Sequence, residues 1–292
     1  MLIIAGIVPL TDLPLVTGKI NQNNDQLVLD GHLLPGGQGT AAMISAALEI
    51  TEYMGLEAPY TVLAGDTGSG KGSRLIYQYL IDHLHELQPE VLALHYWMPD
   101  LALMQELCNV IKQCKQHPIM IADAASMYTA KACGLATEFD LFTPDSSEIA
   151  FLADPDALHP AYINKHLFQS DTDRHPELIE MAYKNQSASS VLLVKGKQDL
   201  IADKNGIITS IDGPDVPAME CIGGTGDSIT GMCAALAYSK MPIERAAITS
   251  AIVNRIAGQM ARVNPASGIK ELVKQIPAAL TQTLHEKQKE VL

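Results

Sequence analysis

The chain of 292 residues is poor in aromatic side chains, in positive charge and in long apolar runs. Aromatic residues make up 5% and tryptophan occurs once, so the 47% hydrophobic content is mainly Ala, Leu, Ile and Val. Such side chains suit helices packed on a buried parallel sheet. The net charge is −13 and no run of Lys and Arg exceeds two residues, which disfavours nucleic-acid binding. No apolar stretch approaches the roughly 18 residues of a membrane span.

Cysteine is also scarce, with five residues and no CxxC pair. An odd number at these spacings argues against a disulfide framework and against a zinc site, and it fits a reducing cytosol. The opening segment MLIIAGIVPL is apolar but has no basic residues before it and is too short to cross a membrane. We interpret it as a buried first strand and expect a cytoplasmic protein that makes no membrane contact.

Strand-like and helix-like segments alternate along the chain. This order, with short connections, predicts an α/β fold with a mostly parallel sheet covered by helices on both faces, in one domain over residues 1–292. Residues 11–35 interrupt the alternation with two short apolar runs around an Asn-rich turn, which predicts a hairpin outside the sheet, a possible lid. The predicted strands are Leu2–Ile7, Tyr60–Ala64, Val91–Leu94, Pro118–Ala122, Leu141–Thr143, Val191–Val194 and Leu200–Asp203. The predicted helices are Thr40–Thr51, Ser73–Leu87, Asp100–Gln116, Glu148–Leu152, Pro176–Asn185, Gly226–Tyr238 and Pro242–Arg262.

The stretch AGDTGSGKGS at residues 64–73 nearly matches a phosphate-binding P-loop. It supplies the glycines and Lys71 after a predicted strand, as the pattern G-x-x-x-x-G-K-[ST] requires. Gly72 stands where the pattern has the hydroxyl that ligates Mg²⁺. We therefore favour a strand-to-helix turn with glycines at positive φ over a nucleotide site.

A second glycine loop, ECIGGTGDSITG, lies at residues 220–231 and runs into an apolar helix. Gly223, Gly224 and Gly226 allow a tight turn that exposes backbone N–H groups at a helix N-terminus, where an anion is favoured. Asp227 falls in the first helical turn. It is a good helix-start residue in any case, but beside an anion site it can also deprotonate a hydroxyl that attacks a phosphoryl group.

These motifs resemble the ribokinase-like superfamily, in the same order along nearly the whole chain. GGTGDSITG resembles its G-[AT]-G-D signature, PGGQGTAA its Gly-Gly substrate loop, and VLAGDTGSGKGS its Gly-Asp turn. The opening strand is similar to that of the ribokinase and phosphofructokinase-B kinases, with residues 11–35 where those kinases have a lid. The resemblance implies a three-layer α/β/α ribokinase-like fold with a small N-terminal lid-like hairpin, and it makes a homodimer through that hairpin a hypothesis.

The resemblance also implies roles for individual residues. The catalytic base is Asp227, with Gly224, Thr225 and Gly226 as an anion hole. Lys195, Gly196, Gly223 and Asn254 are expected on the nucleotide. Substrate contacts are expected from Asp12, Gly36, Gly37, Gly39, Asp66 and Asp123.

Residues Asp145 and Glu148, in TPDSSE, take the place of the superfamily's Asn-x-x-Glu, which organises Mg²⁺ near the phosphates. Two carboxylates suit a hard cation. The alternative is a helix cap, with Asp145 capping and Glu148 at the third helical position. Lys195 could likewise be a solvated strand-end lysine, Asn254 a buried structural amide, and Trp97 a packing residue. The resemblance implies ATP and Mg²⁺ as cofactors.

Two reactions fit this resemblance. The first is a kinase that transfers the γ-phosphoryl group of ATP to a hydroxyl of a small, carbohydrate-type substrate. The second is the ADP/ATP-dependent NAD(P)H-hydrate dehydratase, which the segment LLVKGKQDLIADKNG also resembles. The T-P-H-P-G-E of that family appears here as TPDSSE, and its D-A-D-A-L as DAASM. These departures and the lid-like segment favour the kinase. A nucleotide-binding protein without turnover is a third alternative.

Overall fold

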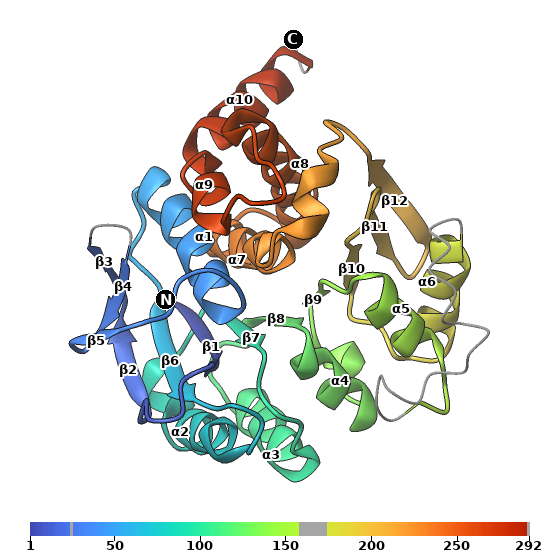
Figure 1. Ribbon diagram of the computed structural model, residues 1–292. Coiled ribbons are helices and arrows are strands. Elements are labelled where there is room, and N and C mark those ends of the chain that lie inside the picture. The colour runs from blue at the N-terminus through green and yellow to red at the C-terminus, as the bar shows by residue number, and fades with distance from the viewer. Residues whose placement is uncertain (24–25, 158–173, 291–292) are drawn as a thin grey trace.

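The computed structural model describes residues 1–23, 26–157 and 174–290, and Figure 1 shows its arrangement. In this part of the chain the central sheet has nine strands in the order β12-β11-β10-β9-β8-β7-β1-β6-β2. The bounds of its strands are β1 Leu2–Val8, β2 Val16–Lys19, β6 Tyr60–Gly65, β7 Val91–His95, β8 Ile119–Asp123, β9 Leu141–Phe142, β10 Val191–Val194, β11 Asp199–Asp203 and β12 Gly206–Ile211.

The six strands from β6 to β10 in the middle of this sheet are parallel, and the edge strands β2, β11 and β12 are antiparallel. The prediction of a mostly parallel sheet is confirmed. The sequence did not predict β12, because its side chains are mostly exposed and its apolar residues do not alternate regularly with polar ones. Parallel strands place their carboxyl ends at one edge of a sheet, so the residues that follow β7, β8 and β10 face the same side.

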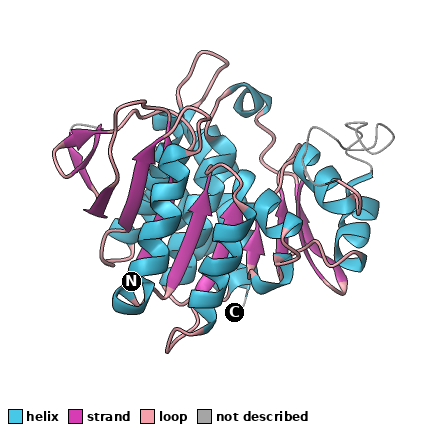
Figure 2. Ribbon diagram, turned by 90° about the horizontal axis from the view of Figure 1, so that it is seen from below, coloured by secondary structure: helices cyan, strands magenta, loops and turns pink. Residues whose placement is uncertain are grey.

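Helices cover both faces of the sheet, as the alternation of strands and helices predicted, and Figure 2 shows these layers. Side chains of β1 alternate between the two cores, with Leu2 and Ile4 in one and Ile3 and Ala5 in the other. The first core is closed by α1 Thr40–Tyr53, α7 Thr225–Tyr238, α8 Ile243–Ala261, α9 Ile269–Val273 and α10 Ile276–Glu290. The second is closed by α2 Lys71–Leu87, α3 Leu101–Lys112, α4 Ala125–Ala132, α5 Ser146–Ala153 and α6 His175–Lys184. Among the described helices none has both the length and the apolarity to cross a bilayer.

A small antiparallel sheet is formed by β3 Asn21–Asn23, β4 Gln26–Leu29 and β5 His32–Leu33. It confirms the predicted N-terminal hairpin and lies beside the β2 edge of the main sheet (Figure 1). Strand β2 itself differs from the prediction, because it pairs with β6 and so belongs to the main sheet. Leu27 and Leu29 of β4 are buried, which anchors the small sheet. Its role in pairing two copies of the chain stays a prediction.

Candidate active site

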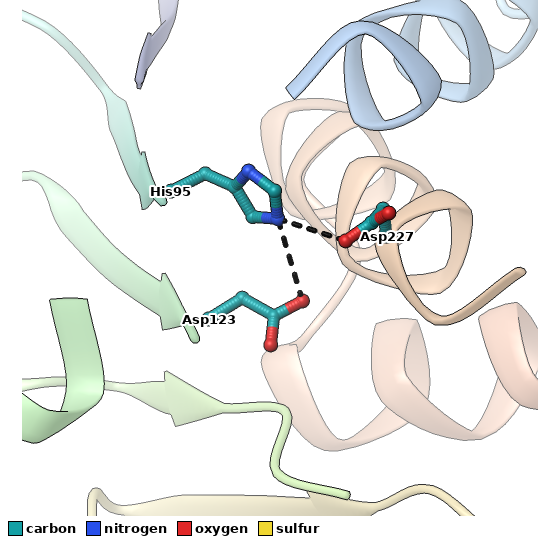
Figure 3. Close-up of side chains that lie close together, drawn as sticks. All are labelled: His95, Asp123 and Asp227. Carbon is teal, nitrogen blue, oxygen red and sulfur yellow. Dashed lines mark hydrogen bonds and ion pairs between the residues drawn. The ribbon is translucent and has the colours of Figure 1, made fainter. Parts of the chain in front are cut away.

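Three titratable side chains meet where two neighbouring strands end and one helix begins. His95 is the last residue of β7, Asp123 is the last residue of β8, and Asp227 lies in the first turn of α7; Figure 3 shows the three pointing toward one another. The next residues, Tyr96 and Ala124, have φ of 56° and 51°. Positive φ is strained for residues other than glycine and is concentrated at functional sites. Both strands therefore turn sharply just after delivering a polar side chain.

Each carboxylate oxygen of Asp227 has a partner from the N-terminal third of the chain. His95 Nε2 lies 3.0 Å from Oδ1, and the backbone N–H of Gly39 donates to Oδ2 at 2.7 Å. Burial acts to raise the pKa of Asp227, but the His95 contact, the Lys195 charge and the Gly39 N–H together lower it below its ordinary value. Asp227 is therefore held as a carboxylate at neutral pH, as a general base must be.

Asp123 is paired with Lys195, which follows β10. Lys195 Nζ lies 2.9 Å and 3.1 Å from the two Asp123 oxygens, and the Thr230 hydroxyl donates to Oδ2 at 2.6 Å. Burial acts to lower the pKa of Lys195, but the charges of Asp123, Glu148 and Asp227 outweigh it and raise the pKa above its ordinary value. A Cβ added at Gly226 would lie 3.4 Å from Lys195 Nζ, so this ammonium sits against the second glycine loop. It is a fixed positive charge at the start of α7.

The cluster of His95, Asp123 and Asp227 has ligand atoms within 4.8 Å of one another, close enough for a metal ion. Three contacts argue for a hydrogen-bonded network instead. Lys195 already supplies the cation to Asp123. Asp227 accepts from Gly39, and its Oδ1 lies at hydrogen-bonding distance from His95. We interpret the cluster as a charge network around Asp227.

A cavity of about 650 Å³ opens over this network. Its lining includes Asp123, Asp227 and Lys195, which we call its floor, and the half-exposed Tyr96. The predicted catalytic, nucleotide and metal residues that line it are Thr225, Gly226, Asp227, Lys195, Gly196, Asn254, Asp145 and Glu148. This volume is in the range of small-molecule and cofactor sites.

The predicted metal pair forms the helix cap that was its alternative interpretation. Asp145 accepts from the backbone N–H of Ser147 and Glu148, and Glu148 accepts from the Asp145 N–H, which is a capping box. The second Glu148 oxygen accepts from the Tyr128 hydroxyl at 2.7 Å. Burial, with smaller contributions from Asp123 and Asp145, raises the pKa of Glu148 to about 8, although Lys195 acts in the opposite direction. Cap and cation site are compatible, because a bound divalent cation would stabilise the ionised form of Glu148 that burial disfavours.

The predicted substrate loop at residues 35–39 lies against the glycine loop at residues 223–227. Gly224 has φ of 100°, and a Cβ there would come 3.0 Å from Ala42 and 3.1 Å from the Gly37 carbonyl oxygen. A Cβ at Gly223 would lie 2.4 Å from the Gln38 side-chain oxygen. Glycine is therefore required at Gly224 by its positive φ and by close approach, whereas at Gly223 the flexible Gln38 side chain could move away. The substrate-loop residue Gly39 reaches Asp227, while Gly36 lies beside the Lys270 side chain.

Of the six predicted substrate residues, Asp123 lines the cavity, whereas Asp12, Asp66 and the three glycines Gly36, Gly37 and Gly39 do not. Asp12 is exposed beyond the end of β1. Asp66 is 4% exposed and accepts from the N–H groups of Gly68, Ser69, Gly70 and Ser73 at 2.8–3.1 Å. Burial acts to raise the pKa of Asp66, but these donors lower it to about 2. The near P-loop therefore wraps around its own carboxylate, and the exposed Lys71 begins α2.

The predicted nucleotide residue Asn254 accepts from the Ser228 hydroxyl at 2.9 Å and also lines the cavity. Its neighbour Arg255 was not singled out from the sequence. Arg255 Nε donates to Asp199 at 2.7 Å, and its Nη2 donates to the carbonyl oxygens of Gly196 and Lys197 at 2.9 Å. This buried ion pair fixes the loop after β10 that carries Lys195.

His95 is the principal residue that sequence reasoning missed. A signal was present, because His95 directly follows a predicted strand just as Asp123 does, but a single histidine in HYWMPD offers no motif. Trp97, two residues on, is fully buried and stacks on Tyr77 with ring centroids 4.3 Å apart, as expected for a packing residue. This stack anchors the loop that presents His95 and Tyr96.

Comparison with known proteins gives a family match. A family model described as NAD(P)H-hydrate dehydratase matches residues 102–278, which include Asp123, Lys195 and Asp227 but neither Gly39 nor His95. An uncharacterized protein of Methanocaldococcus jannaschii is 38% identical over 242 residues, which are 83% of this chain and 100% of that protein. A bifunctional NAD(P)H-hydrate repair enzyme of Hyperthermus butylicus is 34% identical over 116 residues, 39% of this chain and 21% of that protein.

Solved structures agree with the fold. A point mutant of phosphofructokinase-2 from Escherichia coli superposes with a TM-score of 0.56 at 14% identity, covering 96% of this chain and 100% of the enzyme. Pyridoxal kinase of Staphylococcus aureus, with AMP-PCP and pyridoxal, superposes with a TM-score of 0.54 at 12% identity, covering 87% and 86%. The prediction of a ribokinase-like fold is confirmed. At these identities the likeness concerns the fold alone.

Proposed function

The chain belongs to the family described as NAD(P)H-hydrate dehydratase, and we propose that it is a nucleotide-dependent enzyme that removes water from a hydrated reduced nicotinamide cofactor. The observation that carries this proposal is the position of Asp227. It lies in the family-matched part, at the start of α7, on the floor of the cavity and beside the buried pair of Lys195 and Asp123. The small-molecule kinase, favoured by the sequence, becomes the second candidate.

The chemistry follows from the poor leaving ability of a hydroxyl group. Asp227 takes the proton of the hydrate's hydroxyl while the hydroxyl oxygen attacks the terminal phosphorus of the nucleotide; with ATP as donor, the nucleoside diphosphate leaves. The C–O bond of the resulting phosphate ester then breaks, pushed by the lone pair of the ring nitrogen. Loss of a proton from the adjacent carbon restores the reduced ring. The products are the reduced cofactor, nucleoside diphosphate, phosphate and a proton.

The start of α7 is suited to hold the transferred group. The first N–H groups of a helix have no carbonyl partner one turn back, and here they follow Gly224 in its left-handed conformation. Lys195 adds a positive charge at the same point. Removing a positioned general base costs roughly 10²–10⁴-fold in rate, and removing one anion-hole donor roughly 10²–10³-fold.

Asp145 and Glu148 are the residues that would hold Mg²⁺, directly or through water. The raised pKa of Glu148, caused by burial among other carboxylates, fits a site that accepts positive charge. A bound Mg²⁺ would neutralise phosphate charge. The chain's own contribution is to keep both carboxylates fixed in the capping box at the edge of the cavity.

A specific observation supports the kinase as second candidate. The small sheet β3–β5 and the glycine loop at residues 35–39 lie outside the family-matched residues, and that loop reaches Asp227 through Gly39. Both reactions share the first step, phosphoryl transfer to a hydroxyl. In the kinase reaction the phosphate ester is the released product, whereas in the dehydratase reaction phosphate is eliminated from that ester.

The test is nucleotide turnover with a panel of acceptors. ATP or ADP with Mg²⁺ would be incubated with NADH hydrate, NADPH hydrate, sugars, nucleosides and vitamin precursors. We expect the hydrates to regenerate absorbance at the reduced nicotinamide band with release of phosphate. Asp227→Asn should lower this rate roughly 10²–10⁴-fold. The matched control is Asp82→Asn, because Asp82 is exposed on α2 and bonds only to Gln78 among the described contacts.

Release of a stable phosphorylated compound from another acceptor would establish the kinase instead. Nucleotide binding with no turnover of any acceptor, equal in the wild type and in Asp227→Asn, would favour a binding protein.

A further inference from the structure

Asp227 receives hydrogen bonds on both oxygens from the part of the chain that precedes the family match. We propose that His95 is a positioning residue for this reaction, which donates a hydrogen bond to Asp227, holds it as the carboxylate and couples it through Thr40 to the glycine loop. This inference rests on the proposed role of Asp227 as the base. The ring of His95 is fully buried, so its two nitrogens depend on the protein groups that surround it for hydrogen-bond partners.

The hydrogen count around the ring determines which nitrogen donates. The Thr40 hydroxyl has a single hydrogen and two acceptors within reach, the Ile7 carbonyl oxygen at 2.7 Å and His95 Nδ1 at 3.0 Å. If the hydroxyl donates to Ile7, Nδ1 carries a hydrogen and donates to Thr40. If it donates to Nδ1, the ring must carry its hydrogen on Nε2.

In both arrangements Nε2 must donate to Asp227. A ring protonated on Nδ1 alone would place the Nε2 lone pair 3.0 Å from a carboxylate oxygen, which is repulsive. The two remaining states are a neutral ring with hydrogen on Nε2 and a ring protonated on both nitrogens. They differ by one ring proton and by rotation of the Thr40 hydroxyl, so His95 keeps its bond to Asp227 in either charge state.

The groups that face His95 come from every neighbouring element. Asp227 of α7 lies at 3.0 Å and Asp123 of β8 at 3.9 Å. Thr40 of α1 and the carbonyl of Ile7 in β1 close the other side of the ring. Tyr96 follows on the same strand, with ring centroids 4.7 Å apart. Lys195 is bound to both oxygens of Asp123 and offsets the charge of one of the two carboxylates.

Thr40 connects the hydrogen-bond network around His95 to the predicted substrate loop at residues 35–39. It is the first residue of α1 and directly follows Gly39, which donates to the other oxygen of Asp227. The two contacts to the carboxylate therefore come from β7 and from the loop at residues 35–39. Movement of that loop around a substrate would act on Asp227 both directly and through the ring. The carboxylate oxygens keep unused lone pairs for the hydroxyl that is to be deprotonated.

The experiment measures the titration of the Asp227 carboxyl carbon by NMR, which needs no substrate. His95→Leu removes the donor, whereas His95→Gln places an amide N–H near the position of Nε2. We expect the titration midpoint to rise in His95→Leu and to return toward the wild-type value in His95→Gln. Thr40→Val, which preserves the shape of the side chain, should give a smaller rise. The resonance is assigned by its loss in Asp227→Asn.

In turnover assays the acid limb of the kcat/KM profile should move to higher pH in His95→Leu, with a loss of about 10–100-fold near neutral pH and partial recovery in His95→Gln. An unchanged Asp227 midpoint in folded His95→Leu, or in Thr40→Val if the first variant does not fold, would overturn the inference. Altered midpoints without turnover of any hydrate would instead count against the proposed reaction while the role of His95 stands.

Discussion

The glycine loop at residues 65–73 and the glycine loop at residues 223–227 differ in where their aspartate stands. Both loops contain several glycines and lead into a helix, α2 in the first case and α7 in the second. In the first loop Asp66 precedes Gly68, Gly70 and Gly72 and accepts from four backbone N–H groups of the residues that follow it. In the second loop Asp227 follows the glycines, lies in the helix, and accepts instead from His95 and Gly39.

Glycine content alone therefore does not make an anion site. A turn of successive N–H groups attracts negative charge, but in the first loop a carboxylate of the chain already satisfies it. In the second loop the aspartate contacts Gly39 and His95, which belong to other elements. It therefore leaves the first N–H groups of α7 to a phosphate in the proposed reaction. The order of Asp and Gly along the chain is the distinguishing feature.

The largest expected difference is in the loss of stability when the lysine beside each loop is replaced. Lys195 is paired with the buried Asp123, so Lys195→Gln leaves a buried charge without its partner and should lower the free energy of unfolding by about 3–5 kcal/mol. Lys71 is exposed, and Lys71→Gln should change the free energy of unfolding by less than about 0.5 kcal/mol. Chemical denaturation measures both. Equal effects would contradict the charge network described here.

A smaller contrast concerns the aspartate of the first loop. The pKa of Asp66, held at about 2 by backbone donors that outweigh burial, lies below its ordinary value, so its stabilisation is complete above about pH 4 and is lost as the pH falls toward 2. Asp66→Asn should therefore lower the free energy of unfolding by on the order of 1–2 kcal/mol at pH 7. The difference from the wild type should shrink at pH 3 and below. A pH-independent difference would show that charge is not the cause.

The smallest contrast compares matched glycines. Gly68 and Gly224 have φ of 104° and 100°, but a Cβ at Gly68 meets nothing within 4 Å whereas one at Gly224 meets Ala42 and Gly37. Gly68→Ala should cost about 1–2 kcal/mol from the backbone conformation alone. Gly224→Ala should cost more and should also lower turnover, because the two loops must separate. Unfolding curves and kcat/KM for both variants decide this; turnover loss in Gly68→Ala would restore a role for the first loop.

Much of the fold could be predicted from the chain. Strand β10 was predicted with its observed bounds, and helices α1, α2, α7 and α8 within two residues of theirs. Strand β12 and helices α4, α9 and α10 were not, because exposed edge strands and short or polar helices lack a strong apolar period. Residues 11–35 were predicted to form one hairpin outside the main sheet. Their first strand, β2, instead pairs with β6 and becomes an edge strand of the main sheet.

One side of the cavity was largely predictable from the sequence, since Lys195, Gly226 and Asp227 belong to local motifs and all three line the cavity. The opposite side was not. Asp12 and Asp66 occupy motif positions but lie outside the cavity lining, while His95 belongs to no motif and bonds directly to Asp227 on the cavity floor.

The sequence by itself determined the alternation of strands and helices, the acidic and aromatic-poor composition, and the glycine–aspartate start of α7, because each is a property of neighbouring residues. Only the tertiary structure decided which groups complete the site. His95 is separated from Asp227 by 132 residues and Gly39 by 188. They meet because α7 packs against β7 and against α1. Strand order and helix packing are set by burial across the whole chain, and no local pattern encodes them.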